Sequence, residues 1–267
     1  MLKCLLWGKR SSMGKGYSSN EIEKLNIAEK TKDQSANWGI SYCTVEDKRY
    51  PNALKDIPGR PVVLYYRGEI GILNTHKSIA VIGSRNCSPK GKELAYKTGR
   101  LLAGDGMVVV NGLALGCDTE ALRGALDILG KCVAIMPCGL DNIQPKSNRG
   151  LAQKIIDAGG CILSEYSVGT SLAKYQYVER DRLQSGVSQG IVIVEAEKQS
   201  GTMHTAEFAT RQRRRLACYY HKLLEMSSGN QYLTDSGKAV GIRDEEEALS
   251  FARGIPQAEI YQQMSLF

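Results

Sequence analysis

A short apolar strand that ends in glycine and arginine is the stretch of this chain best suited to bind an anion. Residues Ile79–Ile82 are apolar, Gly83-Ser84-Arg85 follows them directly, and a helix-like segment opens at Ser88. Such a strand-to-helix turn presents backbone N–H groups and the positive end of a helix dipole. An arginine beside it adds a planar guanidinium that can bind phosphate through paired hydrogen bonds. The stretch therefore predicts a phosphate site, for a nucleotide or for a nucleic-acid backbone.

Other segments carry residues that could contact the same ligand. Asn111-Gly112 and a long loop that starts near Gly139 follow two further strands, and long loops at strand ends are often functional. Tyr175 and Tyr177 precede a pair of arginines, a mixture that can combine base stacking with phosphate contact. Ser200-Gly201 opens a helix after another strand and is a second candidate anion site. The candidate nucleic-acid-binding residues are Gly83, Ser84, Arg85, Asn111, Gly112, Gly139, Lys146, Asn148, Arg149, Arg180, Arg182, Ser200 and Gly201.

The sequence contains no arrangement typical of a catalytic or metal site. The dinucleotide fingerprint G-x-G-x-x-G and the P-loop are both absent, which disfavours a nicotinamide or flavin enzyme. The histidines His76, His204 and His221 lie in no catalytic pattern. The 8 cysteines include no C-x-x-C pair. We therefore expect reduced thiols, no catalytic residues, no metal and no cofactor.

Composition favours a globular protein with an anionic partner. Hydrophobic residues make up 42% of the chain and the net charge is +7. A basic balance favours nucleic acid among other anions. The apolar runs are too short to span a membrane, and the N-terminal residues lack the features of a secretory signal. We expect a cytoplasmic protein without membrane contact.

An alternation of strands and helices brings the candidate residues to one edge of a sheet. Strands are predicted at 62–66, 79–82, 107–110, 132–136, 161–163, 191–194 and 215–219, and helices at 89–103, 119–129, 147–158, 178–188 and 201–212. This alternation predicts an α/β fold with a doubly wound, mostly parallel sheet and helices on both faces. Right-handed crossovers then place the carboxyl ends of the parallel strands at one edge, where ligands bind.

The chain divides into three parts. Residues 1–37 are polar and predict a loosely ordered N-terminal arm with one short helix that Asn20 could cap. Residues 38–225 form the main domain, with a turn-rich lead-in at 50–68 and a core at 78–220. Residues 226–267 form a short C-terminal extension, with a predicted strand at 237–242 and a helix at 244–253 that Asp244 caps. We also expect Asp118 to cap the helix at 119–129.

Taken in order, these segments resemble the DNA-processing protein A family (DprA, also called Smf). The similar segments are the lead-in Tyr50–Gly68, Val81–Arg85, Gly112–Asp118, Gly124–Leu126, Gly139–Asn148, Leu163–Tyr166, Arg180 with Arg182, Glu195-Ala196 and Ser200–Ala206. Each motif is short, and their shared order and spacing across residues 50–215 carry the resemblance.

The resemblance implies an extended Rossmann-like domain that binds single-stranded DNA in a basic pocket and is not an enzyme. It also implies a homodimer that helps to load RecA recombinase onto the strand during natural transformation. By matching position, Gly83-Ser84-Arg85 would hold backbone phosphate, Lys146 would add a second contact, and Arg180 and Arg182 fall on the paired arginines of the family.

The chain departs from the family pattern at several positions. Leu115 and Leu122 stand where arginine and histidine are usual, which would change the polarity of the strand-end edge. Val178 and Asp181 stand where proline and asparagine are usual, and Arg213 stands where glycine is usual. The C-terminal extension is too short for the winged-helix domain that many members carry.

An alternative comes from the same Rossmann-like superfamily, in which some members bind or cleave nucleotides. Ser200–Glu207 loosely resembles a nucleotide-binding loop of that superfamily, with Glu207 as the candidate acid. A nucleotide-binding sensor or a nucleotide-cleaving enzyme is therefore the second interpretation of this chain.

The last residues suggest a further partner. Gln263-Met264-Ser265-Leu266-Phe267 resembles the short peptide by which bacterial proteins bind the replication sliding clamp. A terminal leucine and phenylalanine can fill an apolar pocket while a glutamine hydrogen-bonds beside them. Gln263, Met264, Leu266 and Phe267 are the candidate clamp-binding residues.

Overall fold

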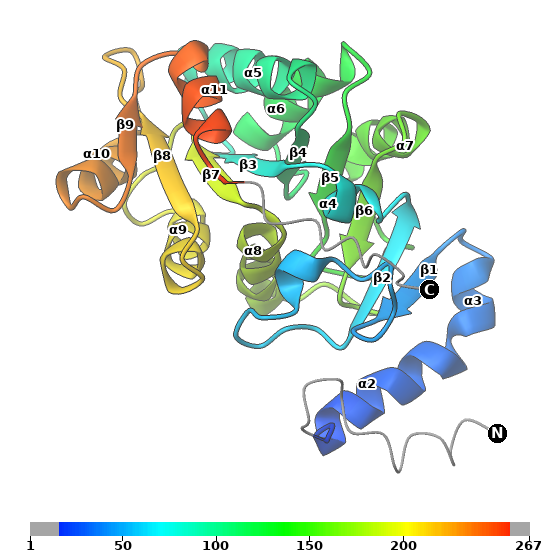
Figure 1. Ribbon diagram of the computed structural model, residues 1–267. Helices are drawn as coiled ribbons and strands as arrows, with labels where there is room; N and C mark the ends of the chain where they lie inside the picture. Colours follow the sequence, from blue (N-terminus) through cyan, green and yellow to red (C-terminus); the bar gives the residue numbers. More distant parts are fainter. Residues whose placement is uncertain (1–15, 257–267) are drawn as a thin grey trace, which may run out of the picture.

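A single nine-stranded sheet lies at the centre of the computed structural model, which describes residues 16–256 (Figure 1). The strand order is β1-β2-β6-β5-β4-β3-β7-β8-β9. The strands are β1 (Ser41–Thr44), β2 (Val63–Gly68), β3 (Ser78–Ile82), β4 (Val108–Asn111), β5 (Cys132–Ile135), β6 (Cys161–Ser164), β7 (Gly190–Ile193), β8 (Arg215–Tyr219) and β9 (Val240–Ile242). The strands from β6 to β9 in this order pair in parallel, whereas β1 and β2 are antiparallel. The predicted α/β class and mostly parallel sheet are confirmed.

Helices cover both faces of the sheet, as Figure 1 shows. The longer helices are α2 (Ser19–Lys30), α5 (Pro89–Gly104), α6 (Cys117–Leu126), α7 (Arg149–Asp157), α8 (Lys174–Val187), α9 (Thr202–Arg211), α10 (Ser228–Asp235) and α11 (Glu245–Arg253). Short helical turns are α3 (Lys32–Ala36), η1 (Asn52–Leu54), α4 (Ile72–Thr75) and η2 (Lys146–Asn148). Helices α5, α6, α7 and α11 lie on one face, and α8 and α9 lie on the other.

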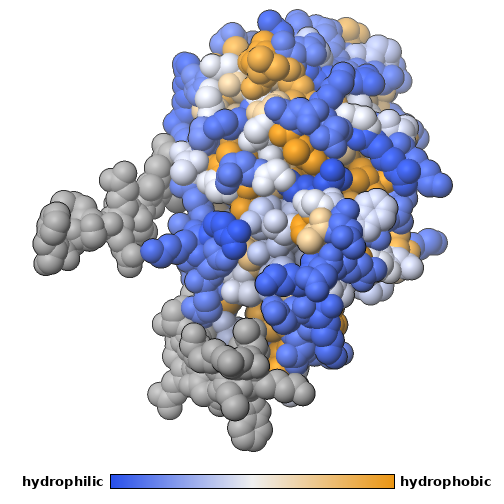
Figure 2. Space-filling view, turned by 90° about the vertical axis from the view of Figure 1, so that its right-hand side faces the viewer, coloured by the Kyte–Doolittle hydropathy of each residue, from blue (hydrophilic) through white to orange (hydrophobic). Residues whose placement is uncertain are grey.

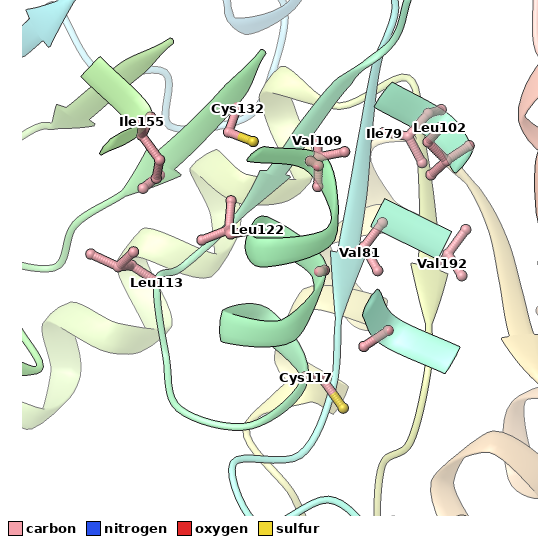
Figure 3. Packing of buried hydrophobic residues seen from close by; sticks show 14 of the residues in the cluster. Ile79, Val81, Leu102, Val109, Leu113, Cys117, Leu122, Cys132, Ile155 and Val192 are labelled. Atoms are coloured by element: carbon pink, nitrogen blue, oxygen red, sulfur yellow. The ribbon is translucent and has the colours of Figure 1, made fainter. Parts of the chain in front are cut away.

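The central strand β3 divides its side chains between two hydrophobic cores. Ile79 and Val81 belong to the cluster under α5 and α6, whereas Ala80 and Ile82 belong to the cluster under α8 and α9. This division follows from the two-residue period of a strand. Both faces are buried, so every residue of β3 after Ser78 is apolar, as is typical of sheets covered on both sides. Figure 3 shows Ile79 and Val81 on one side of this strand.

The direction in which the chain adds strands changes beside β3. From β3 the chain proceeds outward through β4, β5 and β6, and it then returns to place β7 on the other side of β3. The connections that leave the carboxyl ends of β3 and β7 therefore diverge. Divergent connections of this kind open a crevice at the sheet edge, which is where open α/β proteins bind ligands.

The start of α5 is fixed by the sequence around Ser88. The Ser88 side chain accepts a hydrogen bond from the backbone N–H of Gly91 at 3.0 Å, and Pro89 occupies the first turn. Both features are favoured at helix N-termini because they satisfy or remove donors that lack helical partners. Asp244 caps α11 in the same way through the N–H of Glu247, as predicted.

Helix α6 differs from its prediction at its first turn. It begins at Cys117, after Gly116, which has a φ of 75°. Asp118 is therefore inside the helix and does not cap it. Its carboxylate instead accepts hydrogen bonds from the backbone N–H groups of Gly112 and Ala114, at 2.9 and 3.3 Å. The prediction of a cap is wrong because the carboxylate closes the loop after β4.

The N-terminal segment is more ordered than expected in the part that the structure describes. Residues 19–30 and 32–36 are helical, and Ser18 rather than Asn20 caps α2, with Glu21 completing a capping box. Ala28 is buried in the main core, and the Tyr42 hydroxyl donates to a Glu29 carboxylate oxygen at 2.7 Å. These contacts tie α2 to β1, so the segment is not a loose arm between residues 19 and 36.

Leu122 lies in the core and not at the edge of the sheet. Its side chain is fully buried, and Figure 3 shows it on α6 among Val109 and Cys132. The expectation that this position changes the polarity of the edge is therefore wrong. Leu115, in the loop before α6, is 48% exposed and does place an apolar side chain at the surface.

The face drawn in Figure 2 is largely hydrophilic, with hydrophobic residues scattered among charged ones. None of the helices between residues 16 and 256 is long and apolar enough to cross a membrane. Within the same residues, no group of three or more His, Cys, Asp or Glu side chains could hold a metal ion.

Candidate nucleic-acid interface

A cavity of about 590 Å³ opens where the connections after β3 and β7 diverge. Its walls come from the loop after β3, the loop after β4, the first turns of α8, and the loop that leads from β7 into α9. The residues that line it are Ile82, Gly83, Ser84, Arg85, Asn86, Ala114, Asp118, Lys174, Tyr177, Val178, Arg180, Asp181, Gln184, Glu197, Ser200, Gly201, Thr202, His204, Thr205 and Met226. Six of the predicted binding residues are among them: Gly83, Ser84, Arg85, Arg180, Ser200 and Gly201.

The turn after β3 is held tightly against its neighbours. The Ser84 N–H donates to the Glu195 carbonyl oxygen at 2.6 Å, and the Ser84 carbonyl oxygen accepts from the Cys117 N–H at 3.1 Å. A Cβ on Gly83 would come within 2.6 Å of the Cys117 sulfur and 2.9 Å of the Glu195 carbonyl oxygen. Only glycine allows this approach, so the strand-end glycine sets the position of the turn.

Arg85 is positioned at the cavity by an aromatic ring. Its guanidinium carbon lies 5.1 Å from the centre of the Tyr177 ring on α8. The ring is uncharged, and no carboxylate within residues 16–256 forms an ion pair with Arg85. A cation held by an aromatic face keeps its charge available to an anionic ligand. Tyr177 is one of the two tyrosines that precede the predicted arginine pair in the sequence.

The N-terminus of α9 forms the opposite wall. Thr202 begins the helix after Gly201, and no side chain caps it. Ser200 donates from its hydroxyl to the Glu197 carbonyl oxygen at 2.7 Å, which fixes the turn. The positive end of this ten-residue helix faces the same space as Arg85.

Arg180 lines the cavity from below and is almost fully buried. Its Nη1 donates to the Ile135 carbonyl oxygen at 3.1 Å, and its Nε lies 3.1 Å from Asp181 Oδ1. A Cβ on Gly112 would lie 1.3 Å from Arg180 Nη1. Gly112 therefore leaves the space that this guanidinium occupies. Arg180 is thus hydrogen-bonded to the last residue of β5, packs against the loop after β4, and contributes positive charge to the floor of the cavity.

Arg182 lies outside the cavity. Its guanidinium forms an ion pair with Glu165 at 2.8 Å, lies 3.6 Å from a Glu179 oxygen, and donates to the Gly59 carbonyl oxygen. The side chain thereby connects α8 to the lead-in segment. The structure thus assigns different surroundings to the two arginines of the predicted pair.

The remaining predicted residues also lie outside the cavity lining. Asn111 is buried and donates to the Asp118 carbonyl oxygen at 2.9 Å. Asn148 is buried and donates to the Leu113 carbonyl oxygen at 2.9 Å. Gly139 packs closely against the Ser167 carbonyl oxygen. These three residues shape the loops that border the cavity.

Lys146 and Arg149 are exposed near the same border. Both flank Asn148, which is bonded to the loop that contributes Ala114 to the cavity wall. Arg149 donates to the Ile143 carbonyl oxygen at 3.3 Å. They are cations beside the cavity, and their contact with a ligand stays a prediction.

Sequence reasoning did not identify several residues of the cavity. Lys174 is in the first turn of α8, which begins four residues earlier than predicted because the Ala173 N–H donates to the Gln176 side chain. Asp181, Glu197 and His204 also line the cavity. Asp181 follows Arg180 directly in the sequence, and this adjacency to a predicted binding residue could have identified it as a cavity residue.

The fold and the cavity define a Rossmann-like α/β protein with a polar ligand site at the point where its strand order reverses. The family model described as DNA recombination-mediator protein A matches residues 41–253. The chain belongs to this family, the DNA processing protein A family that the motifs indicated.

Named relatives are similar over most of the main domain. The chain is 35% identical over 195 residues to DNA processing protein DprA of Streptococcus pneumoniae, which covers 73% of this chain and 68% of that protein. It is 34% identical over 171 residues to Protein Smf of Synechocystis, covering 63% of this chain but only 43% of that relative. The chain thus spans between about two fifths and two thirds of these relatives.

Two solved structures share the fold. A Helicobacter pylori DNA processing protein A structure, described for its single-stranded DNA binding mode, superposes with a TM-score of 0.71 at 32% identity and covers 79% of this chain and 95% of that one. The Streptococcus pneumoniae DprA structure superposes with a TM-score of 0.75 at 29% identity and covers 88% of this chain and 82% of that one.

Proposed function

We propose that this chain binds the backbone of single-stranded DNA at the cavity between the ends of β3 and β7. Arg85 and Lys174 contact phosphate, and the turn at Gly83-Ser84 and the N-terminus of α9 add backbone donors and a favourable dipole. The protein acts as a non-enzymatic mediator of DNA recombination. Its relative from Helicobacter pylori, described for binding single-stranded DNA, supports the choice of ligand.

The observation that carries the proposal is the position of Arg85. Its guanidinium lies over the Tyr177 ring and forms no ion pair within residues 16–256, in a cavity that opens at the ligand-binding edge of the fold. A cation without a carboxylate partner is available to phosphate at no cost of breaking an ion pair. The adjacent Tyr177 also provides a surface on which a base can stack when DNA draws Arg85 away.

A titration of labelled single-stranded and double-stranded DNA tests this function. We expect tighter binding of single strands, little dependence on sequence, and an affinity that falls steeply with salt, because released counterions dominate phosphate binding. Arg85→Ala should weaken binding about tenfold and lower the salt slope by about one. Arg123→Ala, which removes an exposed arginine from the later part of α6, is the matched control and should bind like the wild type.

Nucleotides titrated in parallel separate this proposal from its alternative. Saturable nucleotide binding without DNA binding would favour the nucleotide sensor or nucleotide-cleaving enzyme. The residue suggested as its acid, Glu207, is exposed on α9 and does not line the cavity. Wild-type DNA binding by Arg85→Ala would argue against the cavity as the site.

We further propose that the protein is a cytoplasmic homodimer that assists RecA recombinase in DNA uptake or recombination. Family membership supports this role. The test is RecA filament formation on single-stranded DNA covered by single-strand-binding protein. The chain should accelerate filament formation, and Arg85→Ala should lose that effect together with DNA affinity. Equal rates with and without the chain would exclude the loading role.

The sliding-clamp peptide at 263–267 lies outside the described residues and remains a sequence-based proposal. Deleting residues 263–267 should abolish retention of the protein on immobilised clamp while leaving DNA binding unchanged. Unchanged retention would exclude the peptide as a clamp contact. Replacing Leu266 and Phe267 by alanine is the smaller change that tests the same contact.

A further inference from the structure

The family resemblance implied a basic pocket, but the cavity is lined by side chains of both charges. Its cationic side chains are Arg85, Lys174 and Arg180, and its carboxylates are Asp118, Asp181 and Glu197. His204 also lines it. The cationic and the carboxylate side chains are equal in number. A ligand with several negative charges is therefore repelled by the carboxylates as well as attracted by the cations.

Arg180 cannot move far from its place in this arrangement. Its side chain is over nine-tenths buried, it donates to the Ile135 carbonyl oxygen, and it fills the space left by Gly112. Its Nε has no hydrogen-bond partner and faces the Asp181 carboxylate at 3.1 Å. The positive charge on the cavity floor is thus fixed, and Asp181 is the group that offsets it.

The two buried carboxylates of the cavity, Asp118 and Asp181, differ in their hydrogen bonds. Asp118 accepts two backbone N–H groups and closes the loop after β4. Asp181 is 7% exposed, and no donor within the described chain is hydrogen-bonded to it. Its only charged partner at contact distance among the described residues is Arg180, and an ion pair that is buried without supporting hydrogen bonds costs free energy. Because Asp181 also lines the cavity, its charge acts on a ligand that enters there.

Charged groups on four segments of the chain face Asp181. Arg180 on α8, His204 on α9 and Arg85 after β3 favour its ionised form, whereas Asp118 on α6 opposes it. Burial is the largest effect and raises the pKa of Asp181 to about 6. The carboxylate is therefore charged at neutral pH and neutral in mild acid.

We propose that Asp181 makes the cavity selective for the single charge of a DNA phosphodiester over the several charges of a free nucleoside polyphosphate. This inference rests on the proposed DNA binding. Each additional ligand charge in the cavity is repelled by Asp181, whereas one phosphodiester is accepted by Arg85 and Lys174. Discrimination of this kind keeps abundant nucleotides from occupying a DNA site.

Competition between ATP and labelled single-stranded oligothymidine tests the inference. The full chain is compared with Asp181→Asn, which keeps the shape and removes the charge, in buffer with chelator at about pH 8 so that Asp181 is ionised. We expect the inhibition constant of ATP to fall about tenfold in Asp181→Asn, and the DNA affinity to rise by a smaller factor of about three. Asp33→Asn, an equal change of charge on the exposed side of α3, should change neither.

The outcomes separate this inference from the function on which it rests. An equal ratio of ATP to DNA affinity in all three proteins would overturn the role of Asp181 while leaving DNA binding intact. Wild-type protein that binds no single-stranded DNA would contradict the proposed function, and calorimetry with ATP alone would still reveal whether Asp181→Asn admits the nucleotide.

Acidification of the unmodified protein provides a second measurement if Asp181→Asn folds poorly. Lowering the pH from about 8 to about 5.5 should strengthen ATP competition because Asp181 gains a proton. A His204→Asn variant removes the imidazole that lines the same cavity and serves as the control. Loss of the entire pH effect in His204→Asn would assign it to the histidine and overturn the inference.

Discussion

The carboxylate of Glu195 accepts two hydrogen bonds from Ser88, although the two residues are 107 positions apart in the sequence. The backbone N–H of Ser88 donates at 2.8 Å and its hydroxyl at 3.1 Å, while Met226 N–H donates to the other oxygen at 2.9 Å. Glu195 is fully buried at the end of β7, and Ser88 caps α5. One carboxylate thus joins the connections from β3 and β7 that form the cavity.

Replacing Glu195 by alanine should destabilise the protein by about 3 kcal/mol, because three donors would lose a buried charged acceptor. Urea unfolding followed by circular dichroism measures the loss as a lower midpoint at constant slope. Glu197→Ala, two residues further in the exposed loop, is the control and should change stability by less than about 0.5 kcal/mol. Similar midpoints for both variants would contradict the assigned role of Glu195.

Replacing Arg213 by glycine should stabilise the protein. It follows α9 with a φ of 57°, and the next N–H, of Arg214, donates back to the Ala209 carbonyl oxygen at 2.8 Å. This left-handed position after a helix favours glycine, so Arg213→Gly should raise the free energy of unfolding by about 1 kcal/mol. Arg211→Gly in the last helical turn should lower it by about as much. Thermal unfolding that shifts both variants in the same direction would contradict this prediction.

Gly112→Ala should disturb the floor of the cavity, since its Cβ would overlap Arg180 Nη1. We expect a loss of about 2 kcal/mol in stability and a several-fold loss of single-stranded DNA affinity. Gly150→Ala on α7 is the matched control, because no atom lies within 4 Å of its added Cβ, and it should be neutral or stabilising. Both quantities are measured on the same preparations, by urea unfolding and fluorescence anisotropy.

Lys146→Ala tests whether the DNA path extends beyond the cavity. Lys146 is exposed beside the loop that Asn148 fastens to the cavity wall. Loss of one phosphate contact should weaken binding several-fold for every sequence and lower the salt slope by about one. Lys154→Ala, near the other end of α7, should bind like the wild type. Equal affinity and slope in both variants would confine the DNA site to the cavity.

Asp181 should make stability depend on pH in the direction opposite to an ordinary salt-bridged carboxylate. Burial raises its pKa to about 6 in the folded protein, above the ordinary value of 3.8 for an aspartate. The folded state therefore binds the proton more tightly, and this group's stabilisation is fully present below about pH 4 and lost as the pH rises past 6.

The difference in unfolding free energy between wild type and Asp181→Asn isolates this contribution. The wild type should lose about 2–3 kcal/mol relative to the variant between pH 4 and 7. Urea unfolding at several pH values within this window measures it. A constant difference across the window would show that the Asp181 carboxyl titrates as it does in the unfolded chain.

Apolar runs and glycines at strand ends were sufficient to predict most of the parallel sheet. A strand covered on both faces must be apolar along its whole length, so β3, β4, β5 and β7 are visible in the sequence. Strand β1 was not predicted, because its pattern is half exposed and its pairing with β2 is a long-range contact. One short helix was predicted near the N-terminus and corresponds to α2, although Ser18 and not Asn20 caps it, whereas the short α3 was not predicted.

Arg180 and Arg182 mark the boundary between what the sequence determined and what the tertiary structure decided. The sequence alone determined the α/β class, the family motifs, and the turn at Gly83-Ser84-Arg85, because these depend on local composition and spacing. Residues two positions apart on a helix are related by a rotation of about 200° about its axis, so their side chains point to nearly opposite sides. Only the packing of α8 decided that Arg180 faces the cavity and that Arg182 faces Glu165 and the lead-in, since helix periodicity does not state which face meets the sheet.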